Sequence, residues 1–213
     1  MPKRFVSIWF RHLKTDWFTR RQPVLHELPF ILVAPDHGRM IVTALNVLAQ
    51  TEGVYTGMAV ADARAIIPSL LVLDDKPELS TPLLTGIAEW CIRYTPSVAL
   101  DPPDGLLLDV TGCAHLWGGE KEYITGIYKR FKNFGYDIRI SIADTIGTAW
   151  AIARFGQGSC MVESAQQTTA LLSLPPAALR LETADIERLE KLGLRQVSNF
   201  INMPRTALRR RFG

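Results

Sequence analysis

The residues with the most distinctive chemistry are the arginines near the C-terminus. Four arginines fall within residues 205–211, and Arg195 follows the apolar-glycine-apolar turn Leu192-Gly193-Leu194. Such a turn between two short helices can direct backbone N–H groups and a helix N-terminus at a phosphate group without reading bases. An ordinary helical pair with a solvated basic end is the alternative. The residues that we predict to contact DNA phosphates are Gly193, Arg195, Arg205, Arg209, Arg210 and Arg211.

The net charge of +3 is confined to the same part of the chain. Residues 1–158 hold 16 basic and 16 acidic side chains, whereas residues 159–213 hold eight basic and five acidic ones. An excess of positive charge at one end of a protein indicates a polyanionic partner.

Several other kinds of site are excluded because the sequence lacks their motifs. The three cysteines lie far apart and form no CxxC pair, so neither a zinc knuckle nor a redox pair is indicated. The four histidines are scattered without metal-ligand spacing, and neither GxxxxGK(S/T) nor GxSxG occurs. We therefore predict no metal ion and no cofactor.

The composition is that of a globular protein. Hydrophobic residues make up 47% of the 213 residues and charged residues 21%, which suits one large domain or two small ones. No apolar run approaches the roughly 18 residues that span a bilayer, and the charged N-terminus shows no secretory signal. A cytoplasmic, nucleoid-associated protein is the expectation.

The elements that must position these residues form a recognisable order. A short apolar run rich in aromatic and β-branched residues predicts a strand at 5–10. From residue 79 onward, helices and strands are predicted to alternate, with a helix at 79–92, strands at 98–100 and 106–110, a helix at 120–134 and a strand at 136–143. This is the split βαββαβ order of a ferredoxin-like sheet. Residues 11–77 would then be an insertion after the first strand.

The insertion and the C-terminal part have their own predicted elements. Within the insertion we expect a strand at 29–35, helices at 41–51 and 59–67, and a strand at 70–73. After Gly158 we expect short helices at 184–192, 196–201 and 205–212. The predicted fold class is α+β, with a ferredoxin-like sheet, an inserted subdomain and a small all-α helix-hairpin-helix domain.

Three motifs in this order resemble those of the Y-family translesion DNA polymerases. They are "GV..GM" at 53–58, "LDVTG" at 108–112 continuing to "LWG" at 116–118, and the segment from Leu192-Gly193-Leu194 to the final "RFG". The resemblance implies a palm at 1–10 and 78–158, fingers at 11–77 and a thumb at 159–213. It also implies a little-finger domain and a tail, absent from this chain, with the clamp-binding motif expected there.

The chemistry of that family implies three carboxylates that hold two Mg²⁺ ions, one on the first strand and an adjacent Asp-Glu pair before "LDVTG". Aligned with the family, Trp9 and Arg11 stand at the first-strand acidic positions, and Asp104 and Gly105 stand at the Asp-Glu pair. Only Asp104 remains of the three. A Pro-Asp-Gly turn is a sufficient structural reason for it, and Trp9 is bulky enough to fill the vacated metal site.

The cations that hold the substrate triphosphate in that family are also replaced. The fingers contacts fall on Ala44, Val47 and Gln50, and the lysines of the palm fall on Ile146 and Trp150. Because phosphoryl transfer depends on electrostatic stabilisation, these losses should abolish catalysis.

The departures themselves resemble the catalytically inactive, ImuB-type branch of the family. The segments that carry this resemblance are residues 8–16, "SIADTIGTAWAIARFG" at 141–156 and "LPPAALRL" at 174–181. It implies an adaptor in a mutasome that serves translesion synthesis and DNA repair. The implied partners are DNA, an error-prone replicative-type polymerase subunit, the sliding clamp and a RecA-like companion protein.

Three other functions stay open at this point. The chain could be a fragment of an active Y-family polymerase with unusual metal ligands. It could be a protein-interaction scaffold without affinity for DNA. A small ferredoxin-like nucleotidyl cyclase would need an intact pair of metal carboxylates on the sheet, which the sequence does not provide.

Overall fold

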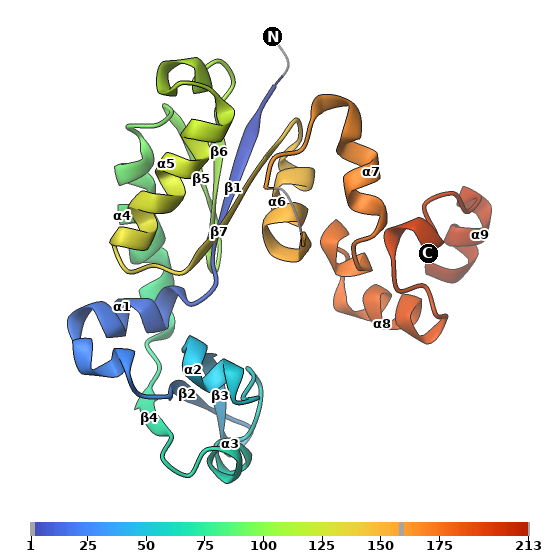
Figure 1. Ribbon diagram of the computed structural model, residues 1–213. Helices are drawn as coiled ribbons and strands as arrows, with labels where there is room; N and C mark the ends of the chain where they lie inside the picture. Colours follow the sequence, from blue (N-terminus) through green and yellow to red (C-terminus); the bar gives the residue numbers. More distant parts are fainter. Residues whose placement is uncertain (1–2, 158–159, 213) are drawn as a thin grey trace.

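The computed structural model describes residues 3–157 and 160–212, without the side chains of 207, 211 and 212. Its larger sheet has four antiparallel strands in the spatial order β5-β6-β1-β7 (Figure 1). These strands are β1 (Phe5–Phe10), β5 (Ser97–Asp101), β6 (Gly105–Asp109) and β7 (Ile138–Ala143). Helix α4 (Ser80–Cys91) joins β1 to β5 after the insertion, and α5 (Glu120–Asn133) joins β6 to β7. The predicted βαββαβ order is therefore confirmed.

The two faces of this sheet are covered by different elements. Helices α4 and α5 pack on one face, where Val6, Ile8 and Phe10 of β1 point into the main hydrophobic core. Helix α6 (Ile146–Phe155) packs on the other face. Because side chains alternate along a strand, Ser7 and Trp9 face α6. One strand thus supplies an apolar face and a face with polar groups.

The insertion forms a second sheet of three strands in the order β3-β2-β4. Its strands are β2 (Phe30–Asp36), β3 (Arg39–Leu45) and β4 (Leu71–Asp74), and its helices are α1 (Leu13–Arg21), α2 (Val47–Thr51) and α3 (Val60–Ile66). The helix expected at 59–67 and the strand at 70–73 are confirmed. The helix expected at 41–51 is wrong over its first half, because residues 41–45 pair with β2 as part of β3.

Local chemistry explains why the helical pattern does not hold there. His37 and Gly38 turn the chain with φ of 45° and 78°, so β3 returns against β2 as a hairpin. Asn46 then begins α2, since its Oδ1 accepts hydrogen bonds from the backbone N–H of Ala49 at 3.0 Å and of Phe30 at 3.1 Å. Pairing across the sheet overrides the local helical periodicity.

The C-terminal part is helical, with α7 (Gln167–Leu172), α8 (Thr183–Lys191) and α9 (Arg205–Phe212). The helix expected at 196–201 is wrong: the chain makes one 3₁₀ turn, η6 (Val197–Asn199), whose start is fixed by the Gln196 N–H donating to Asn199 Oδ1 at 2.9 Å. The remaining 3₁₀ turns are η1 (Pro23–His26), η2 (Pro77–Leu79), η3 (Ala114–Trp117), η4 (Ser164–Gln166) and η5 (Pro176–Leu179).

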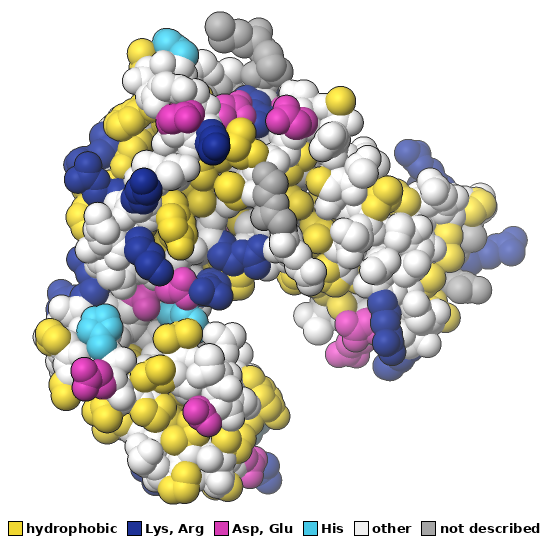
Figure 2. Space-filling view, in the orientation of Figure 1, with side chains coloured by type: hydrophobic (Ala, Val, Ile, Leu, Met, Phe, Trp, Pro, Cys, Tyr) yellow, Lys and Arg dark blue, Asp and Glu magenta, His cyan; other side chains and the backbone are white. Residues whose placement is uncertain are grey.

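The molecule is deeply hollowed between the insertion and the C-terminal helices (Figure 2). In the view of Figure 1 the larger sheet lies above this hollow, and the insertion and the C-terminal helices lie on its two sides. Within the described ranges, no helix is both long and apolar enough to cross a membrane.

Candidate functional site

Three of the four residues aligned with metal carboxylates meet at one end of the larger sheet. Trp9 of β1 is paired with Gly105 of β6. Asp104 directly precedes β6, and the Trp9 indole Nε1–H donates to its Oδ2 at 2.9 Å. The tryptophan that replaces a carboxylate is therefore bound to the one carboxylate that remains.

Arg154 of α6 completes this end of the sheet. Its Nη2 lies 2.8 Å from Asp104 Oδ1 and 3.3 Å from Asp101 Oδ2, so a single guanidinium bridges two carboxylates. The guanidinium carbon also lies 5.4 Å from the ring centre of Trp9 and 4.7 Å from that of Trp150. The Arg154 side chain is only 11% exposed. A buried cation thus occupies the position between the two carboxylates.

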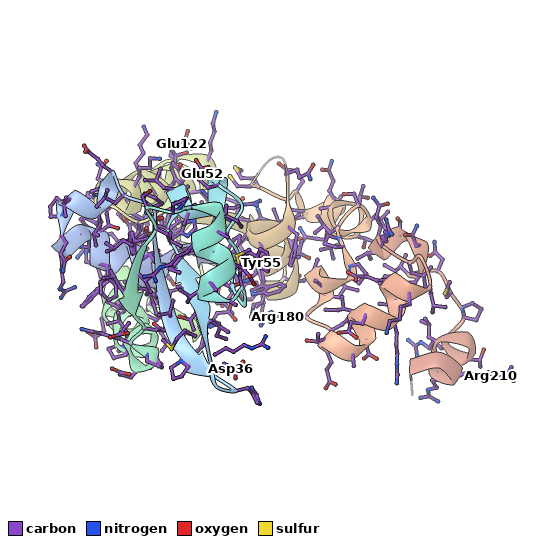
Figure 3. The ribbon with its side chains drawn as sticks, turned by 90° about the horizontal axis from the view of Figure 1, so that it is seen from below. Asp36, Glu52, Tyr55, Glu122, Arg180 and Arg210 are labelled. Atoms are coloured by element: carbon purple, nitrogen blue, oxygen red, sulfur yellow. The ribbon has the colours of Figure 1, made fainter. Side chains whose placement is uncertain are left out.

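Arg180 brings the C-terminal part to the same network. It follows η5 with a φ of 56°, and its Nη2 pairs with Asp101 Oδ1. Its guanidinium carbon stacks 4.3 Å from the ring centre of Trp150. Arg180 lies where the C-terminal helices meet the palm-like sheet (Figure 3). We call Trp9, Asp101, Asp104, Arg154 and Arg180 the closed site.

Arg139 of β7 holds the end of the helix that carries Arg154. Its guanidinium donates to the backbone oxygens of Ile152 and Arg154, each at 3.3 Å, and to that of Gly156. These carbonyls lie at the C-terminus of α6, where the Ile152 oxygen also accepts the Gly156 N–H at 3.0 Å. Arg139 therefore fixes the last turn of α6, and with it the backbone of Arg154.

Burial controls the protonation of the charged pair. Desolvation raises the pKa of Asp104 above its usual value, although the Trp9 hydrogen bond and the nearby Arg154 oppose the rise. Desolvation also lowers the pKa of Arg154, and the two carboxylates oppose that change. Each charge is thus costly to bury and is retained by its partners.

Gly105 has a steric reason to lack a side chain. A Cβ at this position would lie 2.9 Å from Asp101 Oδ2 and 3.2 Å from Arg154 Nη2. A glutamate, which the family pattern places here, would therefore displace the ion pairs of the closed site.

The closed site does not fit a pair of magnesium ions. Mg²⁺ needs oxygen ligands with free lone pairs in near-octahedral geometry. Here each oxygen of Asp101 faces a guanidinium, and Asp104 is shared between an indole and a guanidinium. Across residues 3–157 and 160–212, no three His, Cys, Asp or Glu side chains are grouped to hold a metal ion.

Arg11, the fourth aligned residue, takes no part in the ion pairs of the closed site, although the cavity that it lines extends to Asp104. Its Nη2 pairs with Asp137 Oδ2 at 2.6 Å. It lines a cavity of about 540 Å³ between the larger sheet and the insertion, together with Ala44 and Gln50. The other cation of this cavity, Lys14, binds both oxygens of Asp75 at 2.6 Å. Both cations that line the cavity are therefore already paired with carboxylates.

The predicted phosphate site at Gly193 needs a correction. Gly193 has a φ of 75°, and its N–H donates to Glu190 O at 2.9 Å, while the Leu194 N–H donates to Leu189 O at 2.9 Å. These bonds close the C-terminus of α8. Both amides are used inside the protein, so the expected amide contact with a phosphate does not fit this turn.

The predicted arginine contacts lie on exposed segments. Arg195, Arg205, Arg209 and Arg210 are exposed, and none makes an ion pair with another described residue. Figure 3 shows Arg210 at the far end of the C-terminal helices, away from the larger sheet. The side chain of Arg211 lies outside the described residues. The exposed arginines remain the candidate DNA-contact residues.

The decisive members of the closed site were missed from the sequence. Asp101 lies just before the predicted Pro-Asp-Gly turn, and Arg154 and Arg180 lie in two of the segments that resemble the ImuB-type branch, but none of the three was predicted as a site residue. They come from segments at least 92 residues beyond Trp9, and Arg154 lies 50 residues after Asp104. The one signal that could have indicated them is the need of a partly desolvated carboxylate such as Asp104 for a cationic partner.

The chain matches the model of the impB/mucB/samB family over residues 8–154. It belongs to this family. The Protein ImuB of Caulobacter vibrioides (strain NA1000 / CB15N) is 42% identical over 161 residues, which cover 76% of this chain and 35% of that protein. The DNA polymerase IV of Serratia proteamaculans (strain 568) is 23% identical over 214 residues, which cover 95% of this chain and 60% of that protein.

Solved structures agree on the fold. The crystal structure of DinB from Sulfolobus solfataricus superposes with a TM-score of 0.79 at 16% identity, covering 99% of this chain and 63% of that one. The insertion ternary complex of Dbh DNA polymerase gives the same TM-score and coverage. The expected resemblance to Y-family polymerases and to their ImuB-type branch is confirmed. The chain spans about a third of the length of ImuB and less than two thirds of these polymerases.

Proposed function

We propose that this protein is a non-catalytic, polymerase-shaped adaptor that binds DNA without sequence preference and serves translesion synthesis by recruiting a true polymerase. The observation that carries the proposal is the closed site, in which Arg154 bridges Asp101 and Asp104 and Trp9 binds Asp104. A buried guanidinium supplies the positive charge where catalysis in the family requires metal ions.

The energetics of the closed site oppose metal binding. A metal ion would have to displace Arg154 from two carboxylates in a place where its side chain is 11% exposed. Moving that cation away would leave it without its partners, and breaking a buried pair costs about 3–5 kcal/mol. The site would still offer too few oxygens to position two ions for phosphoryl transfer.

The proposed partners rest on the family branch. The similarity to ImuB supports a place in a mutasome with an error-prone replicative-type polymerase subunit, a sliding clamp and a RecA-like companion protein. DNA would be held through its backbone by Arg195, Arg205, Arg209 and Arg210. Phosphate contacts of this kind give weak, non-specific and steeply salt-dependent binding. A nucleoid-associated location in the cytoplasm would follow.

Primer extension tests the absence of catalysis. Purified protein is incubated with primer-template DNA, all four dNTPs and either Mg²⁺ or Mn²⁺, beside a DNA polymerase IV as positive control. We expect no templated extension. Extension that disappears in Asp104→Asn would overturn the proposal, because it would show that this carboxylate holds a catalytic metal.

Salt titration tests the DNA contacts. Binding of fluorescent duplex DNA is measured by anisotropy for the wild type and for Arg205→Glu/Arg209→Glu/Arg210→Glu. The matched control, Arg64→Glu/Lys121→Glu/Lys129→Glu, reverses as many exposed charges elsewhere. We expect the first variant to lose most binding and to flatten the salt dependence. No binding by the wild type at low salt would favour the scaffold without DNA affinity.

A further inference from the structure

An apolar groove crosses the helical face of the larger sheet, on the side opposite α6. It lies between α4 and α5 and has a volume of about 250 Å³. A second cavity of about 420 Å³ adjoins it, because Arg20, Leu83 and Tyr136 line both. The side chains and backbone that form the floor of this α4–α5 groove come from Leu83, Gly86, Ile87, Trp90, Phe131 and Phe134.

Three guanidinium groups are held against aromatic rings of the groove or of the adjoining cavity: Arg20 lines both, Arg21 lines the second, and Arg93 stacks on Trp90, which lines the first. Arg21 stacks 3.8 Å from the ring centre of Trp17, Arg93 stacks 4.3 Å from that of Trp90, and Arg20 stacks 4.6 Å from that of Tyr136. None of them has a carboxylate within 4.0 Å among the residues that the structure describes. They are oriented cations without an acidic partner.

We propose that the α4–α5 groove docks an acidic amphipathic helix of a partner protein. Apolar side chains of such a helix would enter the groove, and carboxylates on its flanks would meet the three guanidiniums. Arginines held over rings lose little further freedom when they bind a carboxylate, and their planar forks match it in a bidentate geometry. Helix-in-groove recognition combines these two kinds of contact.

Nucleic acid fits this surface less well. Bases bind proteins by stacking on free aromatic faces. Here the rings of Trp17, Trp90 and Tyr136 each carry a guanidinium on one face. Trp90 is also packed edge-on against Tyr94, Phe131 and Phe134, with ring centres 5.1–5.5 Å apart. An apolar floor offers a phosphate backbone no donor.

The α4–α5 groove would give the adaptor a surface for a protein partner, and in this respect the proposal rests on the proposed function. The DNA-contact residues proposed above lie on the C-terminal helices, whereas the groove lies on the opposite face of the sheet (Figure 1). DNA and a partner protein could therefore be held together on one chain.

Two glycines allow a matched test. A Cβ at Gly86 of α4, or at Gly126 of α5, would meet nothing within 4 Å, so both accept a side chain without disturbing the core. Only Gly86 lines the groove. Gly86→Glu places a negative side chain in it, and Gly126→Glu makes the same chemical change outside it. Thermal unfolding should show that both variants remain folded.

The probe is a fluorescein-labelled peptide of about 15 residues, designed as a helix with Leu and Phe on one face and Glu on its flanks. Anisotropy at low salt should show binding to the wild type and to Gly126→Glu, and at least about tenfold weaker binding to Gly86→Glu and to Arg21→Glu/Arg93→Glu. The same peptide with Lys in place of Glu should bind more weakly than the acidic one.

Four results would overturn the proposal. The first is that the wild type does not bind the acidic peptide, and the second is that both glycine variants bind it equally well. The third is that the wild type binds single-stranded DNA more tightly than the peptide and that Gly86→Glu weakens this DNA binding. The fourth is that the protein self-associates and that Gly86→Glu alone abolishes the self-association. The last would assign the groove to a second copy of the chain. Peptide binding is read without DNA or dNTPs, so its failure is distinct from failure of the proposed function in primer extension or DNA binding.

Discussion

The two faces of the larger sheet have very different side chains, although the same strands form both. Toward α4 and α5, β1 and β6 present Val6, Ile8, Leu106 and Leu108, all fully buried and apolar. On the face toward α6, Trp9 of β1 lies beside Asp101 and Asp104, and these two carboxylates pair with Arg154 and Arg180. The first face is covered by the main hydrophobic core, whereas the second combines a smaller apolar cluster around α6 with a network of charges.

The contrast shows how a fold can be kept while a site is rebuilt. Side chains on opposite faces of a strand contact different neighbours, so one face can change without repacking the other. The apolar face supplies the burial that stabilises the sheet. This agrees with a TM-score of 0.79 to polymerase structures at only 16% identity.

Truncation on the apolar face should have the largest effect on stability. Phe131 is 1% exposed and packs edge-on against Phe10 and Trp90 with ring centres 5.3 Å away. We expect Phe131→Ala to lower the free energy of unfolding by about 3–5 kcal/mol, measured by urea denaturation. Tyr128→Ala, on the exposed side of the same helix, should change it by less than about 0.5 kcal/mol. Equal losses would show that α5 does not pack as described.

Removal of the central cation on the charged face should have the next largest effect, and it should depend on pH. Arg154→Met removes the cation that buried Asp101 and half-buried Asp104 share, which should cost about 2–4 kcal/mol at pH 8. Burial raises the pKa of Asp104, and without Arg154 less opposes that rise, so its folded-state pKa lies further above its unfolded value. The loss should therefore shrink as the pH falls through about 4, where this carboxyl becomes protonated in the unfolded state as well.

A triple variant provides the control for this effect. Arg154→Met/Asp101→Asn/Asp104→Asn removes the buried cation and both carboxylates, leaving only Arg180, whose side chain is 45% exposed, and it should recover part of the stability at pH 8. A loss that is the same at every pH would contradict the view that charge, rather than packing, dominates this face.

Two glycine-to-alanine changes separate the faces more finely. Gly105→Ala places a Cβ 2.9 Å from Asp101 Oδ2 and should lower the free energy of unfolding by about 1–3 kcal/mol. Gly86→Ala, in a helix with open space around it, should raise it by about 0.5–1 kcal/mol. Urea denaturation measures both, and a stabilising Gly105→Ala would mean that the ion pairs are loose.

A smaller dependence of stability on pH should come from Asp16, a carboxyl where α1 meets the larger sheet. Burial, aided by repulsion from Asp137, raises the pKa of Asp16 to about 7, although its Oδ2 accepts the Asp137 N–H at 2.8 Å. The folded state therefore holds this proton more tightly than the unfolded state, and stability should fall as the pH rises from about 4 to 7.

Asp16→Asn removes this titration. Because Asp16 is half-buried and water offsets part of the cost, we expect the variant to be about 1 kcal/mol more stable at pH 8 and equal to the wild type near pH 4. Thermal unfolding across this range checks it. Parallel curves for the two proteins would contradict the raised pKa.

The sequence was sufficient for the order of elements but not for contacts between distant segments. The apolar residues at 5–10 and 136–143 correctly predict β1 and β7, since short apolar segments of this kind suit a buried strand. Residues 41–45 were predicted as helix because pairing with β2 is not a local property. Asp104 and Trp9 were identified from the family pattern. Arg154 could not be found in this way, because its role depends on how α6 packs across β1.

Arg139 shows why the closed site is not easily reversed. It touches neither Asp101 nor Asp104, yet it clamps the carbonyls at the end of α6, from which Arg154 extends. A descendant that regained acidic residues at positions 9 and 105 would still carry a guanidinium anchored over them. A metal centre at this place would therefore require the end of α6 to be loosened first.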